Sequence, residues 1–115
     1  MNVESQLDLN QERLRTLEKM KKLLPIVVGA ELKVGEAAYA DGALTAKQKR
    51  LIALGVALGR GCTNCILGQT MRSLEAGATS DELLETLGVA IAIGGTMGMA
   101  ESMRVVKLLE EMGKL

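Results

Sequence analysis

Residues 45–77 read TAKQKRLIALGVALGRGCTNCILGQTMRSLEAG, and this stretch decides the fold because it contains two helical patterns joined at a Gly-Cys pair. Thr45 and Gln48 have the spacing of a capping box, and Leu51, Leu54 and Leu58 recur on one helical face. This pattern predicts a helix that ends at Gly59–Gly61. A second pattern begins near Cys62–Asn64 and stops at Gly77, which predicts another helix.

The sequence on either side of this stretch is also helical in its apolar periodicity. Pro25 ends the first pattern, an Asp-Gly turn ends the second, and Thr79 with Glu82 forms another capping box. No segment alternates with period two for long enough to be a strand. We therefore predict an all-α fold, a bundle of about six helices forming a single domain over residues 1–115, with the remaining helices at Ser5–Leu24, Val27–Ala38, Thr79–Gly95 and Met99–Gly113.

The composition excludes several classes of function. The 14 basic and 14 acidic residues balance, so no electrostatic attraction to nucleic acid or an anionic membrane is expected. Histidine is absent, which removes His-based catalysis and His-ligated metal. Tyr39 is the one aromatic residue, and we expect it to pack with its hydroxyl at the surface; no cofactor such as flavin or haem is expected.

No targeting or membrane segment is expected. Met1–Gln6 are polar, and the longest uncharged stretch, Thr86–Ala100, is shorter than a bilayer span and is broken by glycines. These features predict a cytoplasmic protein, in which thiols are normally reduced.

The glycines and the apolar content predict an assembly. Gly55 and Gly59, and likewise Gly94 and Gly98, are spaced one helical turn apart, which predicts close approach between helices within or between subunits. The chain is 48% hydrophobic, and Thr86–Ala100 is almost continuously apolar. One small bundle cannot hide this much apolar surface, so a homo-oligomer is expected.

Cys62-Thr63-Asn64-Cys65 is the one motif that can carry chemistry. A thiolate at a helix start is stabilised by free backbone N–H groups and by the helix dipole, and Arg60 adds positive charge. We therefore predict a redox-active dithiol with a lowered thiol pKa at Cys65. Two alternatives remain: both cysteines are small buried packing residues, or they supply half of a zinc site bridging two subunits.

The motif and its surroundings resemble the alkylhydroperoxidase D-like branch of the carboxymuconolactone decarboxylase family. The resemblance lies in Leu44-Thr45, Lys49–Leu54, Gly61–Cys65, Glu75–Thr79, Glu82-Leu83 and Gly94-Gly95. It implies an all-α protein that forms trimers or hexamers, and we favour a homohexamer. It also implies that Cys65 attacks a small peroxide or disulfide substrate, that Cys62 resolves the intermediate, and that a thiol donates electrons.

Three positions depart from the family pattern: Arg50 replaces a glutamate, Gln69 a histidine and Asn64 a tyrosine. The glutamate and histidine form a proton relay in the family, and neither replacement is a base at neutral pH. Arg50 either stabilises the thiolate by its charge or is an ordinary solvated charge, and the activity is either retained or weakened. Gln69 either holds a carbonyl or a substrate by hydrogen bonding, or it only hydrogen-bonds to a nearby polar group that would otherwise lack a partner.

We therefore predict a thiol-disulfide oxidoreductase or peroxidase-like protein. The first alternative is a non-catalytic oligomeric binding or redox-sensing protein on the same fold, and the second is a carboxymuconolactone decarboxylase-like lyase. Four methionines either line a soft pocket beside the cysteines or fill the core: Met71, Met97, Met99 and Met103.

Overall fold

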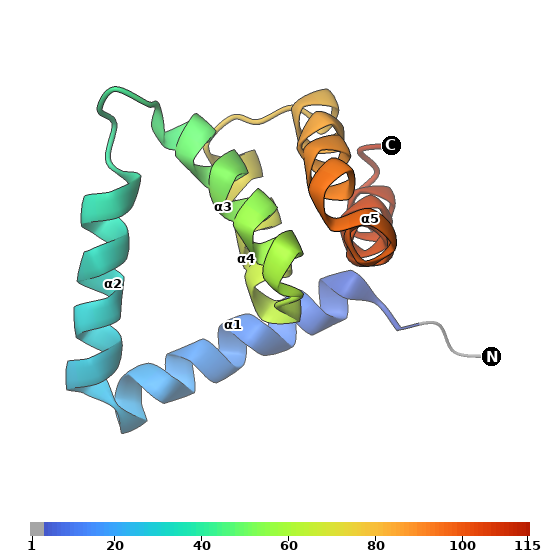
Figure 1. Ribbon diagram of the computed structural model, residues 1–115. Helices are drawn as coiled ribbons and strands as arrows, with labels where there is room; N and C mark the ends of the chain where they lie inside the picture. Colours follow the sequence, from blue (N-terminus) through green and yellow to red (C-terminus); the bar gives the residue numbers. More distant parts are fainter. Residues whose placement is uncertain (1–3) are drawn as a thin grey trace.

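The computed structural model describes residues 4–115, and no strand occurs in this part of the chain (Figure 1). The all-α prediction is therefore confirmed. Met1–Val3, on which the expectation of no signal sequence partly rests, lie outside the described residues. The five helices are α1 (Gln6–Leu23), α2 (Pro25–Tyr39), α3 (Ala46–Arg60), α4 (Thr63–Glu75) and α5 (Ser80–Glu111).

Helices α3, α4 and α5 enclose the hydrophobic core. Leu54 and Leu58 of α3 are fully buried, as their shared helical face predicts, and they pack with Ile66 of α4 and Leu83 of α5. Both predicted capping boxes are present, at Thr45–Gln48 and Thr79–Glu82, and they begin α3 and α5. Short-range capping and periodic apolar positions therefore account for this half of the fold.

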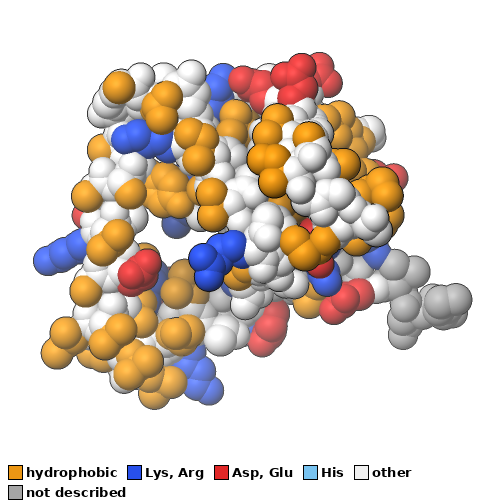
Figure 2. Space-filling model, in the orientation of Figure 1, with side chains coloured by type: hydrophobic (Ala, Val, Ile, Leu, Met, Phe, Trp, Pro, Cys, Tyr) orange, Lys and Arg blue, Asp and Glu red, His pale blue; other side chains and the backbone are white. Residues whose placement is uncertain are grey.

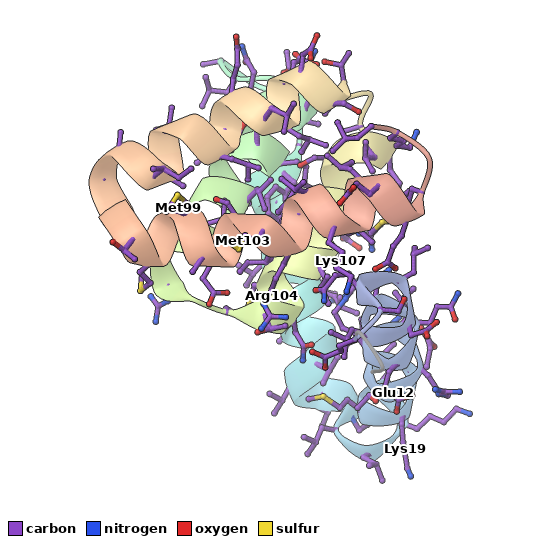
Figure 3. The ribbon with its side chains drawn as sticks, turned by 90° about the vertical axis from the view of Figure 1, so that its right-hand side faces the viewer. Glu12, Lys19, Met99, Met103, Arg104 and Lys107 are labelled. Carbon is purple, nitrogen blue, oxygen red and sulfur yellow. A yellow bond between two sulfur atoms is a disulfide. The ribbon has the colours of Figure 1, made fainter. Side chains whose placement is uncertain are left out.

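The element α5 consists of two helices joined at a kink, as the two patterns Thr79–Gly95 and Met99–Gly113 predict. Counting it as one helix accounts for the difference between five helices and the predicted number of about six. Gly95 has φ 57° and ψ −133°, a backbone conformation that needs glycine, and the chain reverses direction there. Figure 3 shows the two halves of α5 lying antiparallel and side by side. The hydroxyl of Ser80 donates to the carbonyl of Lys114 at 3.0 Å, so the two ends of this hairpin meet.

Gly98 makes this hairpin possible, which confirms the predicted close approach at this position. A Cβ at Gly98 would lie 2.6 Å from the carbonyl oxygen of Ala90 and 3.1 Å from Cα of Ile91. At Gly55, Gly59 and Gly94, by contrast, a Cβ would have no neighbour within 4 Å. These three glycines therefore make no close approach within one chain, and for them the alternative of contacts between subunits stays a prediction.

Helices α1 and α2 form an arm that leaves the core (Figure 1). The start of α1 is attached to the end of α5 through Glu111, whose carboxylate accepts hydrogen bonds from the Ser5 hydroxyl at 2.7 Å and the Gln6 N–H at 2.9 Å. Only Val28 of α2 is buried. Apolar side chains gather at the α1–α2 corner of the arm (Figure 2), where Ile26 is 85% exposed.

Among residues 4–115, Ser80–Glu111 is the one helix that is long and apolar enough to span a membrane. Its most apolar window has a mean hydropathy of 1.5. The reversal at Gly95 divides this length between two antiparallel halves, so neither half has the roughly 20 residues of a spanning helix.

Candidate redox site at the Cys62–Cys65 pair

The two cysteines lie where α3 ends and α4 begins. Gly61 closes α3 with φ 67°, and the N–H groups of Gly61 and Cys62 donate to the carbonyls of Leu58 and Ala57, each at 3.2 Å. This glycine-dependent turn delivers Cys62 directly to the N-cap position of α4. The predicted placement of the Cys-x-x-Cys motif at a helix start is confirmed.

Cys62 and Cys65 form a disulfide, with their Cα atoms 5.2 Å apart. Sγ of Cys62 also accepts the backbone N–H of Cys65 at 3.2 Å, in the manner of an N-cap side chain. Cys65 is exposed, whereas Cys62 is half-buried. The sulfur that accepts a backbone N–H at the helix start is therefore that of Cys62, and the predicted lowering of the Cys65 thiol pKa stays a prediction.

The disulfide borders a cavity of about 890 Å³ between the end of α2, α3 and α4. Figure 2 shows the molecule hollowed between α2 and the other helices. Arg60, predicted as a supporting residue, lines this cavity together with both cysteines and Gln69. Its other walls are mostly apolar and come from Ala38, Tyr39, Leu44, Lys49, Ile52, Ala53, Val56 and Ala57.

Arg50 and Gln69, the replacements for the family's glutamate and histidine, are in contact. Nη1 of Arg50 donates to Oε1 of Gln69 at 3.2 Å, and the guanidinium lies 3.5 Å from the centroid of the Tyr39 ring. Burial lowers the pKa of Arg50 from its usual value, and the charge of Arg72 acts in the same direction against the opposing effects of Tyr39 and Glu75. A guanidinium remains protonated at neutral pH even so.

Arg50 is therefore held by two side chains and is not simply a solvated charge. Tyr39 belongs to this cluster, although the sequence indicated only a packing role for it. Tyr39 and Arg50 come from different helices on either side of a loop, so no local spacing relates them. The cation–π contact and the hydrogen bond fix the guanidinium plane against the wall of the cavity.

A second cavity, of about 410 Å³, reaches Cys65 from the side of α1. Asn64 lines this cavity and not the larger one, so the predicted supporting residues are divided between the two sides. Arg13 also lines it and fits against Gly68, where a Cβ would lie 3.2 Å from the guanidinium carbon. Burial and the charge of Arg72 lower the pKa of Arg13, while Glu75 opposes this shift.

Of the two alternatives for the four methionines, a pocket beside the cysteines is not formed by them. None of Met71, Met97, Met99 and Met103 borders the larger cavity. Met99 and Met103 instead line a separate groove on α5 with Lys107 (Figure 3). Met97, Met99 and Met103 do not fill the core of the chain either, since all three are exposed, whereas Met71 is half-buried.

No group of three or more His, Cys, Asp and Glu side chains that could hold a metal occurs among residues 4–115. A zinc site bridging two subunits through four cysteines would need two copies of the Cys62–Cys65 pair.

The fold and the disulfide together define a class: all-helical proteins with a Cys-x-x-Cys pair at a helix N-terminus beside a cavity. Within that class, the chain belongs to the carboxymuconolactone decarboxylase family, whose profile matches residues 30–108. The family resemblance predicted from the motif residues is confirmed.

Two curated relatives match most of the chain. An uncharacterised protein of Cupriavidus necator is 39% identical over 74 residues, which cover 64% of this chain and 66% of that protein, just under two thirds of its length. Uncharacterised protein 4 in the cox locus of Paracoccus denitrificans is 32% identical over 82 residues, covering 71% of this chain and 74% of that protein.

Solved structures share the complete fold. A carboxymuconolactone decarboxylase family protein of Legionella pneumophila, crystallised in its apo form, is 31% identical, with a TM-score of 0.87 over 95% of this chain and 97% of that one. A family protein of Thermotoga maritima is 27% identical, with a TM-score of 0.77 over 89% of this chain and 87% of that one. Involvement in an antioxidative response has been suggested for the Thermotoga protein.

Proposed function

We propose that this protein is a thiol-disulfide oxidoreductase that uses the Cys62–Cys65 dithiol to reduce a peroxide or a disulfide. The observation that carries the proposal is the disulfide at the N-terminus of α4, with Cys65 exposed and reachable from two cavities. The suggested antioxidative role of the Thermotoga relative supports the same reaction class.

In the proposed reduction the two cysteines have different tasks. A donor thiolate attacks the exposed Sγ of Cys65, the S–S bond breaks, and Cys62 leaves as a thiolate. The N–H of Cys65 and the N-terminus of α4 stabilise this leaving group, and a thiol of lower pKa leaves faster. A second donor thiolate then attacks the donor sulfur of the mixed disulfide and frees Cys65, so the donor is oxidised to its disulfide.

Oxidation by a peroxide uses the same two positions. The Cys65 thiol loses its proton and its thiolate attacks one peroxide oxygen. The O–O bond breaks, the departing alkoxide takes up a proton, and Cys65 becomes a sulfenic acid. The Cys62 thiolate then attacks Sγ of Cys65. This step restores the disulfide and releases hydroxide, which takes up a proton to become water.

Without a relay histidine, deprotonation of Cys65 depends on its surroundings. Arg50 is the cation held next to Gln69, four residues after Cys65, and the proposal gives it an electrostatic part in place of proton transfer. We expect turnover to be slower than in relatives that carry the glutamate and the histidine. The proposal includes a cytoplasmic location, where a pool of donor thiols keeps the pair cycling.

The test is peroxide consumption by the reduced protein with dithiothreitol as donor. We expect turnover in the wild type and none in Cys65→Ser, with Arg104→Gln as a control far from the pair. Mild oxidation followed by alkylation and intact-mass measurement should show both thiols lost together in one intramolecular disulfide. A pair that forms no such disulfide would favour the alternative of a non-catalytic binding protein, whereas turnover that persists in Cys65→Ser would contradict the role given to Cys65.

We also propose that the protein acts as a homo-oligomer, a hexamer by family resemblance with a trimer as the alternative. The chain exposes 7380 Å², whereas a compact monomer of 12.2 kDa should expose about 6,100 Å². The excess of roughly 1,300 Å² is the size of surface that one subunit buries in a large, permanent interface. Large apolar side chains are available for such an interface, since Ile93 is 88% exposed and Val89 is 64% exposed on α5.

A further inference from the structure

The larger cavity beside the disulfide has mostly apolar walls, and the charged residues that line it are all basic. Its apolar wall includes Leu44, Ile52, Ala53 and Val56. The charged residues that line it are Lys49 and Arg60, and no Asp or Glu lines it. A cavity of about 890 Å³ falls within the usual size range of small-molecule sites.

The cations around this cavity lack carboxylate partners. Among residues 4–115, Lys49 and Arg60 take part in no ion pair, whereas Lys47, on the same helix, pairs with Glu82 at 2.8 Å. Nζ of Lys49 donates only to the backbone carbonyl of Ala40, a neutral acceptor. The nearby carboxylate of Asp41 accepts the N–H of Ala46 at 2.6 Å at the start of α3.

Arg50 adds a third positive charge next to the cavity, although it does not line it. It contacts two residues that line the cavity, Tyr39 and Gln69, and both of these contacts are to neutral groups. The site therefore presents an apolar surface and positive charge without an ion-pair partner in one cavity, which both cysteines also line.

We infer that the substrate is an amphipathic anion: an organic hydroperoxide with an apolar chain and a carboxylate group. This inference rests on the proposed function and names the substrate class of the same site. The apolar chain lies against α3, which separates Lys49 in its first turn from Arg60 at its end by about 16 Å. Lys49 holds the carboxylate, and the peroxide group meets Cys65 at the other end, where Arg60 adds positive charge. The hydroperoxide is reduced to the hydroxy acid and water, and the dithiol is oxidised to the disulfide.

The first test measures binding without turnover. Tyr39 is the one aromatic residue of the chain and lines the cavity, so its fluorescence reports ligand entry directly. Oxidised protein is titrated with decanoate and with decanol, which share the chain and differ in charge. We expect decanoate to bind more tightly and its affinity to fall as salt is raised, because exposed charges are screened.

Charge removal identifies the residues responsible. Lys49→Met and Arg60→Met should each weaken decanoate binding roughly two- to fivefold, the range for exposed charge pairs, and leave decanol binding unchanged. Lys19→Met removes an exposed lysine of α1 outside the cavity (Figure 3) and should change neither affinity. The conclusion does not depend on one variant, because Lys49→Met and Arg60→Met are made separately. Far-UV circular dichroism checks that both variants fold.

A second test uses turnover of linoleic acid hydroperoxide against its methyl ester. The free acid should have the lower KM, and Lys49→Met should reduce the difference. The inference is overturned if decanol binds as tightly as decanoate, or if both cavity variants bind decanoate like the wild type. If the binding tests fail but the protein still turns over hydrogen peroxide, only the inferred substrate class is wrong and the proposed reaction stands. Decanoate binding without any peroxide turnover removes the proposed reaction and leaves an anion-binding cavity.

Discussion

Gly98 should be the position in α5 least tolerant of a methyl group. Its Cβ would lie 2.6 Å from the carbonyl oxygen and 3.1 Å from the carbonyl carbon of Ala90, and both atoms belong to the backbone of the antiparallel half. No side-chain rotation can relieve this clash, so Gly98→Ala must push the two halves of the hairpin apart. Overpacking of this kind costs about 1–3 kcal/mol, against a gain in helix propensity of up to about 1 kcal/mol.

The middle of these ranges gives a net loss for Gly98→Ala of about 1–2 kcal/mol, which corresponds to a fall in Tm of roughly 5–15 °C for a domain of this size. Gly88→Ala is the matched control, because Gly88 lies in the same helix with nothing within 4 Å of its Cβ position. The control should gain up to about 1 kcal/mol from helix propensity. Thermal unfolding followed by circular dichroism at 222 nm, at one fixed protomer concentration, measures both changes.

Both substitutions replace glycine by alanine, yet the Tm should fall for Gly98→Ala and rise for Gly88→Ala. A Tm for Gly98→Ala equal to or above that of Gly88→Ala would refute the close contact between the halves of α5. A fall for both variants would show instead that Gly88 is covered in the native assembly.

Three further predictions concern the dithiol, the assembly and the attachment of α1. In single-cysteine variants, the pH profile of alkylation should give the lower thiol pKa for Cys62, because its sulfur occupies the N-cap of α4; a lower value for Cys65 would contradict this assignment. Ile93→Glu should lower the mass measured by light scattering towards 12.2 kDa with little loss of helicity, since Ile93 is 88% exposed in one chain, whereas Lys19→Glu should leave the mass unchanged. Desolvation raises the pKa of Glu111, but hydrogen bonds from the Leu7 N–H, the Ser5 hydroxyl and the Gln6 N–H outweigh it and leave this pKa below the ordinary value of 4.5. The stability due to these bonds is present above pH 4.5 and is lost as the pH falls through the lowered pKa, so the urea midpoint of the wild type should fall more steeply below pH 4.5 than that of Glu111→Gln.

The helices could be predicted from the sequence because their determinants are local. Capping boxes at Thr45 and Thr79 act over three residues, and the apolar positions of α3 repeat once per turn. The position of the cysteines at a helix start follows from the same local rules, since Gly61 ends one helix immediately before Cys62.

Only the tertiary structure decided how these helices combine into a site. Whether two predicted helices continue or reverse depends on the contact between Gly98 and Ala90, which a sequence pattern does not contain. Tyr39 and Arg50 meet across a loop, and their contact depends on how α2 is placed against α3. Helix formation is governed by bonds between residues three or four positions apart, whereas the cavity, its unpaired cations and the reversal at Gly95 arise from packing between residues distant in the sequence.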